Sequence, residues 1–102
     1  MVCDQSRIVI AAGPGSVAAT GYREAEMIGS EIAQLLHLSF EDGEDPIARS
    51  LDWGVRVLDV PCAFRPNGLD EMRRATIDLF PAYDEDGGLL VALTPLRGAV
   101  LV

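Results

Sequence analysis

Hydrophobic and polar residues follow two different periods along this chain, and the change falls near Val55. Before that residue, apolar side chains occur in short groups at intervals of three and four, which is typical of amphipathic helices. After it, apolar and polar residues alternate with a period of two, which is typical of strands. The pattern predicts small helices in the first half of the chain and an antiparallel meander in the second.

The first half is expected to begin with two short strands, over residues 2–4 and 7–12, because a β-branched run ends at the turn signal Gly13-Pro14-Gly15. Short helices should follow, separated by glycines and a loop over residues 39–45. The predicted helices are 17–20 between Ser16 and Gly21, 24–28 before Gly29, 31–36 after its cap Ser30, and one from Asp45-Pro46 to Trp53 before Gly54.

The second half predicts three strands, over residues 55–64, 75–80 and 89–96. One face of the first strand is expected to carry Arg56, Leu58, Val60, Cys62 and Phe64, with Val57, Asp59 and Ala63 on the other. In the second strand, Ala75, Ile77 and Leu79 alternate with Thr76, Asp78 and Phe80. Pro61 has no N–H to donate to a ladder, so the first strand should lie at an edge or be bulged there.

Composition and charge narrow the class of protein. The chain has 102 residues, 49% of them apolar and 24% charged, which predicts one folded domain spanning residues 1–102. Its net charge of −8 repels phosphate backbones, so a nucleic-acid partner is not expected. The sequence holds neither a long apolar span nor the basic start of a signal peptide, so we expect a cytoplasmic protein without membrane contact. Cys3 and Cys62 are expected to be reduced thiols.

One alternative is a nucleotide-binding, Rossmann-like fragment, because the strand at 7–12 is followed by the dinucleotide fingerprint Gly13-x-Gly15-x-x-Ala18. Three observations count against it. Pro14 removes an N–H that a phosphate loop would use. Gly21-Tyr22 interrupts the long crossover helix that this motif needs, and the second half of the chain alternates as hairpins.

The sequence gives no pattern for catalysis or for a metal site. The only histidine, His37, has no nucleophile and acid in a triad pattern around it, and the acidic residues gather in loops. A lone thiol at Cys62 does not make a zinc site. We therefore expect no catalytic residues, no metal ligands and no enzyme activity.

Five short motifs in order resemble PAS sensory domains. The most informative is the segment 21–29, with Gly21-Tyr22 at its start and Ile28-Gly29 at its end. Glu26, within this segment, matches the acidic residue of the family, and the other matching stretches are 7–15, 65–68 and 81–87. Two positions depart from the family pattern: Gly13 replaces the usual Asn, and residues 94–98 replace the closing Asp-Ile-Thr. The resemblance covers essentially the whole chain.

The resemblance implies an α+β, PAS-like fold: a five-stranded antiparallel sheet with short helices on one face. It also implies a sensory or regulatory domain, excised from a larger bacterial signalling protein such as a histidine kinase, a cyclic-dinucleotide enzyme or a transcription regulator. The effector would then lie in the same polypeptide. A ligand-free protein-interaction module is the alternative within this fold.

Ligands and partners are expected on the same basis. A flavin adduct is not expected because residues 31–36 contain no cysteine, and haem is not expected because the helix from Asp45 to Trp53 contains no histidine. Trp53 is interpreted either as a core or subunit-interface anchor or as part of a small-molecule cavity between the last helix and the sheet. The predicted lining of that cavity is Leu51, Trp53, Cys62, Phe64 and Ile77. Phe80, opposite Ile77 and Leu79, suggests a homodimer through the outer sheet face.

Overall fold

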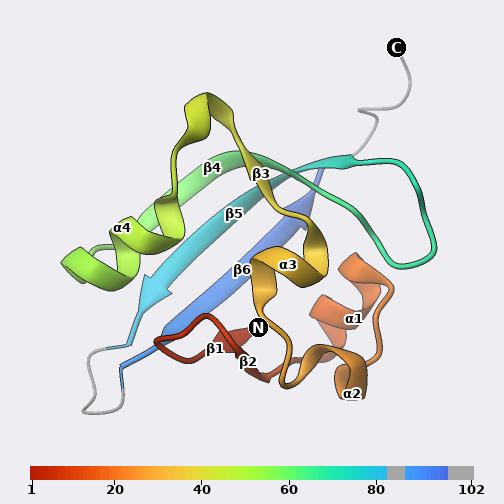
Figure 1. Ribbon diagram of the computed structural model, residues 1–102, viewed down its shortest axis with the longest axis horizontal. Coiled ribbons are helices and arrows are strands. Elements are labelled where there is room, and N and C mark those ends of the chain that lie inside the picture. The colour runs from red at the N-terminus through yellow and green to blue at the C-terminus, as the bar shows by residue number, and fades with distance from the viewer. Residues whose placement is uncertain (83–86, 97–102) are drawn as a thin grey trace.

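The computed structural model describes residues 1–82 and 87–96 (Figure 1). The strands are β1 (Val2–Cys3), β2 (Val9–Ala11), β3 (Ser39–Phe40), β4 (Val57–Phe64), β5 (Arg73–Pro81) and β6 (Leu89–Pro95). The helices are α1 (Pro14–Thr20), α2 (Glu24–Met27), α3 (Ile32–Leu36) and α4 (Pro46–Trp53), with a 3₁₀ turn η1 at Glu41–Gly43. Most of the predicted acidic turn over 84–88, and the end of the motif at 94–98, lie outside the described residues.

The strands form one antiparallel sheet in the order β2-β1-β6-β5-β4-β3. The meander β4-β5-β6 confirms the strands predicted from the alternation. The sheet has six strands where five were expected, because Ser39 and Phe40 pair with Ala63 and Cys62 in a segment predicted as a loop. Two residues are too few to show an alternation of apolar and polar side chains. Only the pairing of this segment with β4 reveals the strand.

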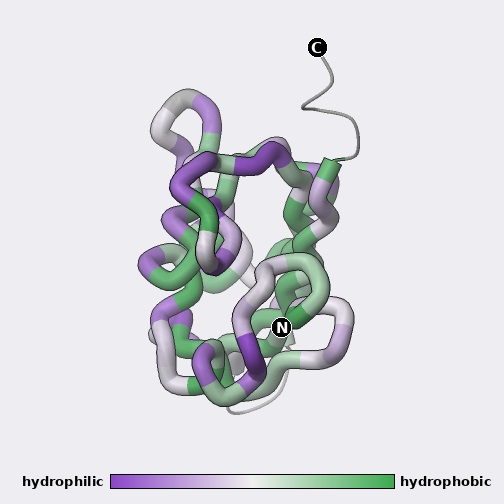
Figure 2. The backbone as a smooth tube through the Cα atoms, turned by 90° about the vertical axis from the view of Figure 1, so that its right-hand side faces the viewer, coloured by the Kyte–Doolittle hydropathy of each residue, from purple (hydrophilic) through white to green (hydrophobic). Residues whose placement is uncertain are grey.

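The helices cover one face of the sheet (Figure 1), and the core lies between the two layers. In the side view (Figure 2), hydrophobic and hydrophilic stretches alternate along the backbone. The predicted alternation in β5 is confirmed, because Ala75, Ile77 and Leu79 are at most 1% exposed. The buried core consists of Met1, Cys3, Val9, Met27, Ile32, Leu36, Ile47, Cys62, Phe64, Ala75, Ile77, Leu79, Leu89 and Val91.

A bulge in β4 makes part of the predicted facing of this strand wrong. Val57 pairs with Leu79 and Val60 with Ile77, so β4 advances by three residues over a stretch in which β5 advances by two. Asp59 takes the extra position with a φ of 55°, and its N–H donates to the Asp78 carboxylate at 2.7 Å. Val57 therefore turns to the core side with Val60. Leu58 is 52% exposed, and Arg56 precedes the strand and is also exposed.

Pro61 follows the bulge, and because it has no N–H to donate, it should lie at an edge of the sheet or at a bulge. On the N-terminal side of Cys62, β4 pairs with β5 on one side and, among the described residues, has no strand on the other. This stretch is therefore an edge, as the proline predicted.

The helix ends are largely those predicted. Asp45 caps α4 by accepting the Ala48 N–H at 3.1 Å, and Gly54 ends it with a φ of 63°. For α3 the predicted cap, Ser30, is wrong by one residue: the Glu31 carboxylate accepts the N–H groups of Ala33 and Gln34. α1 begins at Pro14, ahead of the predicted cap Ser16.

Candidate functional site

Four of the five predicted cavity residues belong to or pack against the core, and Trp53 does not. Phe64 and Ile77 are at most 1% exposed and belong to the packed core, and Cys62 is 8% exposed beside them. Leu51 packs against this core from α4. Trp53 is 78% exposed at the end of the same helix, so it is not a core anchor.

The residues of this set that reach the surface do so in different places. Trp53 lines a shallow depression with Arg49 and Val55. Leu51 lines another, beside the connections of β1 to β2 and of β5 to β6. Cys62 lines a third, of about 240 Å³, between β3, β4 and β5. On α4 itself, Ile47 and Ser50 are at most 1% exposed.

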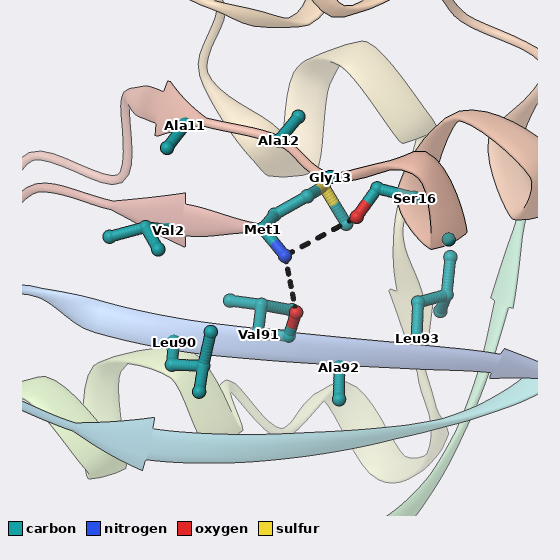
Figure 3. Close-up of a pocket in the computed structure, with 11 residues that line it drawn as sticks. Met1, Val2, Ala11, Ala12, Gly13, Ser16, Leu90, Val91, Ala92 and Leu93 are labelled. Atoms are coloured by element: carbon teal, nitrogen blue, oxygen red, sulfur yellow. Dashed lines mark hydrogen bonds between the residues drawn. The ribbon is translucent and has the colours of Figure 1, made fainter.

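A larger groove of about 640 Å³ lies where β1 begins beside β6 (Figure 3). One wall is the connection from β2 into α1, and the other is β6. Between them lies Met1, whose nitrogen donates to the Val91 carbonyl at 2.8 Å and to Ser16 Oγ at 3.3 Å. Burial lowers the pKa of this amino group. The lining residues are Met1, Val2, Ala11, Ala12, Gly13, Gly15, Ser16, Leu90, Val91, Ala92 and Leu93.

Sequence reasoning missed this groove, although a signal for it was present. Gly13, Gly15 and Ser16 belong to the fingerprint that was weighed as a nucleotide motif. A Cβ built on Gly13 or Gly15 meets nothing within 4 Å, so these glycines leave open space on this wall. The Rossmann-like alternative itself is contradicted, because every strand pairing in the described residues is antiparallel and α1 ends after seven residues.

Two polar contacts attach the helical layer to the rest of the fold. The Arg7 guanidinium, on the β1–β2 connection, pairs with the Asp45 carboxylate at the start of α4 at 2.8 Å. His37 ends α3 in a left-handed conformation, and its Nε2 contacts the Arg65 guanidinium just after β4. His37 is thus placed by a structural contact.

The thiols are poorly suited to nucleophilic chemistry. Burial raises the pKa of Cys62 to about 11. Burial also raises the pKa of Cys3 to about 11, where the amino group of Met1 opposes the rise and the carboxylates of Asp4 and Glu31 add to it. A thiol with such a pKa is almost entirely protonated at neutral pH.

Within residues 1–82 and 87–96, no group of three or more His, Cys, Asp or Glu side chains is arranged to hold a metal ion. No helix in these same ranges combines the length and the apolar character needed to cross a membrane.

An antiparallel sheet covered on one face by short helices is an α+β architecture. The comparisons agree at the level of the fold. The chain superposes on the crystal structure of the PAS domain of nitrogen regulation protein NR(II) from Vibrio parahaemolyticus, with a TM-score of 0.74. The match covers 94% of this chain and 86% of that chain, at 16% sequence identity. No family model and no curated protein matches the sequence. The PAS-like fold expected from the motifs is confirmed.

Proposed function

We propose that this chain is a sensory or regulatory PAS-type domain of a bacterial signalling protein, acting in the cytoplasm without catalysing a reaction itself. The observation that carries the proposal is the fold shared with the PAS domain of NR(II) over 94% of the chain. Such a domain would pass its state to an effector in the same polypeptide. Deleting residues 1–102 from the parent polypeptide should change the output of that effector, and an unchanged output would contradict a regulatory role.

A ligand of the domain would have to act on the helical layer. α4 is the part of this layer that bears Leu51 and Trp53, and it is tied to the β1–β2 connection through the Arg7–Asp45 pair. We propose that a small molecule entering between α4 and the sheet would displace this helix and contact the five residues predicted from the sequence. The displacement is required because Phe64 and Ile77 are already packed.

Native mass spectrometry of protein purified without denaturation tests for such a ligand. A reproducible added mass, lost on unfolding and regained on refolding with the released compound, would support sensing. Matched variants should localise it: Ile77→Ala alters the proposed cavity, whereas Ile28→Ala changes an exposed side chain that follows α2. A bare chain in every preparation would contradict ligand binding.

The second candidate is a ligand-free protein-interaction module. The burial of Phe64 and Ile77 in the core supports this candidate, because both residues were predicted to line a cavity and are at most 1% exposed. In that case a partner chain, such as a second copy, acts on the surface of the domain. A bare mass together with concentration-dependent association would support this candidate over sensing.

A further inference from the structure

The connection between β4 and β5 contains the only asparagine of the sequence, Asn67, and a glycine follows it. The two residues form an exposed turn. A hydrogen bond from the Leu69 N–H to the Pro66 carbonyl at 3.3 Å closes the turn, and Gly68 has a φ of 80°. A Cβ built on Gly68 would meet nothing within 4 Å, so the space around it is open. Asn67 and Gly68 are therefore accessible to water.

An asparagine that precedes a glycine carries both reactants of an internal acyl transfer. The glycine nitrogen loses its proton to a solvent base and attacks the side-chain carbonyl carbon, Cγ, which lies close to it along the chain. A bond from this nitrogen to Cγ forms and the bond from Cγ to Nδ2 breaks, and Nδ2 takes up a proton and leaves as ammonia. Water then opens the cyclic imide at either carbonyl group, which leaves an aspartate or an isoaspartate. Glycine permits the attack because it has no side chain to obstruct it.

The structure leaves the attacking nitrogen available. Among the described residues, no hydrogen bond uses the Gly68 N–H. By contrast, the Asn67 N–H donates to the Thr20 carbonyl at 2.9 Å, and the Leu69 N–H closes the turn. An N–H that already donates must break its hydrogen bond before it loses its proton. The nitrogen that the reaction requires is thus the one that the turn leaves unbonded.

Asn67 also attaches this turn to the helical layer. Besides the bond to Thr20, its side-chain Nδ2 donates to the Gly21 carbonyl at 3.2 Å. Thr20 is the last residue of α1 and Gly21 is its cap. A Cβ built on Gly21 would lie 3.6 Å from the Asn67 Cβ, so the two segments are in direct contact. The amide group that the reaction removes therefore helps to hold the β4–β5 connection against α1.

The products of the reaction would weaken this attachment. A carboxylate at position 67 has no N–H to donate at neutral pH. Its charge would also lie beside the carbonyl end of a helix, where a negative charge is unfavourable. The isoaspartate product lengthens the backbone by a methylene group as well, which displaces the turn.

We propose that the Asn67-Gly68 pair is a site of spontaneous deamidation, and that the reaction releases the β4–β5 connection from the end of α1. Water is the only co-reactant, and nothing is oxidised or reduced. The inference does not depend on the sensory role proposed above, because it rests on contacts within the chain.

Incubation of the folded chain at pH 8 in ¹⁸O-enriched water tests the reaction. Peptide mapping by mass spectrometry should find the heavy oxygen at position 67. One side-chain hydrogen bond must open first, so the folded chain should react at most about tenfold more slowly than the chain in denaturant, which corresponds to about 1.4 kcal/mol. A larger slowing would show that the fold keeps the reactants apart and would overturn the proposal.

Asn67→Gln is the matched control for the chemistry. It keeps an amide at the same position, but cyclisation would need a larger ring that closes more slowly, so this variant should take up little label there. In the unaltered chain, isoaspartate should form together with aspartate, because water opens the imide at either carbonyl. Aspartate alone, or equal labelling of the two chains, would indicate direct hydrolysis and would overturn the proposed route.

Hydrogen exchange followed by nuclear magnetic resonance tests the release from α1. After conversion, the amide at position 67 should exchange about tenfold faster, once corrected for the change of side chain, because its bond to Thr20 is weakened. The Arg65 N–H is the control, since it donates to the Leu36 carbonyl of α3 at 2.8 Å and should keep its rate. Asn67→Asp should give the same difference without incubation. Unchanged exchange at position 67, or equal acceleration at both amides, would overturn the release.

Discussion

At the scale of single residues, close backbone approaches decide which side chains the fold accepts. Gly88 has a φ of 114°, which L-residues rarely adopt, and a Cβ built there would lie 2.7 Å from the Cys3 carbonyl oxygen. This approach lets the chain entering β6 pass close to β1. Glycine at this position is therefore required by both conformation and space.

Gly88→Ala should destabilise the domain by about 1–3 kcal/mol, because the strained φ and the clash with a backbone atom act together. Gly15→Ala is the matched control: its Cβ meets open space within a helix, so it should stabilise by up to about 1 kcal/mol. Urea unfolding of the three proteins measures both effects. A neutral Gly88→Ala variant would show that the β1 backbone moves aside at little cost.

The buried thiols lead to a second prediction at this scale. Raising the pKa of Cys62 from 9.0 to about 11 lowers its thiolate fraction at pH 8 about a hundredfold. Cys3 has a pKa raised to a similar value and is 1% exposed. Iodoacetamide at pH 8 should therefore alkylate both thiols slowly in the folded chain and rapidly in denaturant, as followed by intact mass. Fast labelling of the folded chain at either site would contradict this burial.

At the scale of elements, the short helices depend on their end groups because each contributes few core residues. α4 illustrates this dependence. Asp45 caps the helix through the Ala48 N–H and also pairs with Arg7, so one carboxylate fixes both the start of α4 and its position over the sheet. Partial burial of the Asp45 carboxylate acts to raise its pKa, but hydrogen bonds from Arg7 and Ala48, with the charge of Arg7, outweigh burial and lower it.

The lowered pKa fixes the sign of a pH prediction. Asp45 stabilises the fold while it is ionised, so this stabilisation is present above the unfolded pKa of about 3.9 and is lost as the pH falls through the lower pKa of the folded state. Asp45→Ala should cost about 1–2 kcal/mol at pH 7 and progressively less toward acid.

Asp45→Asn is the control for the cap, because an amide oxygen still accepts the Ala48 N–H but lacks the charge that attracts Arg7. It should cost at most about 1 kcal/mol, as expected for an exposed ion pair. Unfolding curves recorded at several pH values compare the two variants. An effect of Asp45→Ala that persists undiminished at the acid end would show that packing, and not the carboxylate, accounts for the loss.

At the scale of the whole molecule, the sheet has one covered face and one open face. On the open face, Leu90 pairs with Val2 on one side and with Phe80 on the other, which gives an apolar row across β1, β6 and β5. Leu90 is 47% exposed. This row supports the proposal that two copies of the domain associate through their outer sheet faces.

Leu90→Glu should abolish such a homodimer, because it places a charge in the centre of the apolar row in both copies. Ile28→Glu is the matched control, since Ile28 is also exposed but follows α2 on the helical side. Sedimentation velocity at high micromolar protein distinguishes the three chains. A monomeric unaltered chain would contradict dimerisation, and equal dissociation of both variants would contradict the proposed face.

The sequence by itself determined the parts of the fold that rest on local chemistry. Asp45-Pro46 and Gly54 marked both ends of α4 because capping groups and left-handed glycines act over a few residues. The alternation at Ala75, Ile77 and Leu79 predicted the buried face of β5, since a strand has a fixed period of two. The order of these elements, together with the motif at 21–29, indicated the PAS-like fold.

Only the tertiary structure decided what depends on residues that are distant in sequence. The bulge at Asp59 reversed the facing of Leu58, because the register of β4 is set by its pairing with β5. Trp53 is exposed although it ends the helix that packs on the core. The groove that Leu93 lines likewise depends on where β1, β6 and α1 lie relative to one another. Local preferences fix the type and ends of an element, whereas the relative positions of elements come from packing, which no single segment of the chain contains.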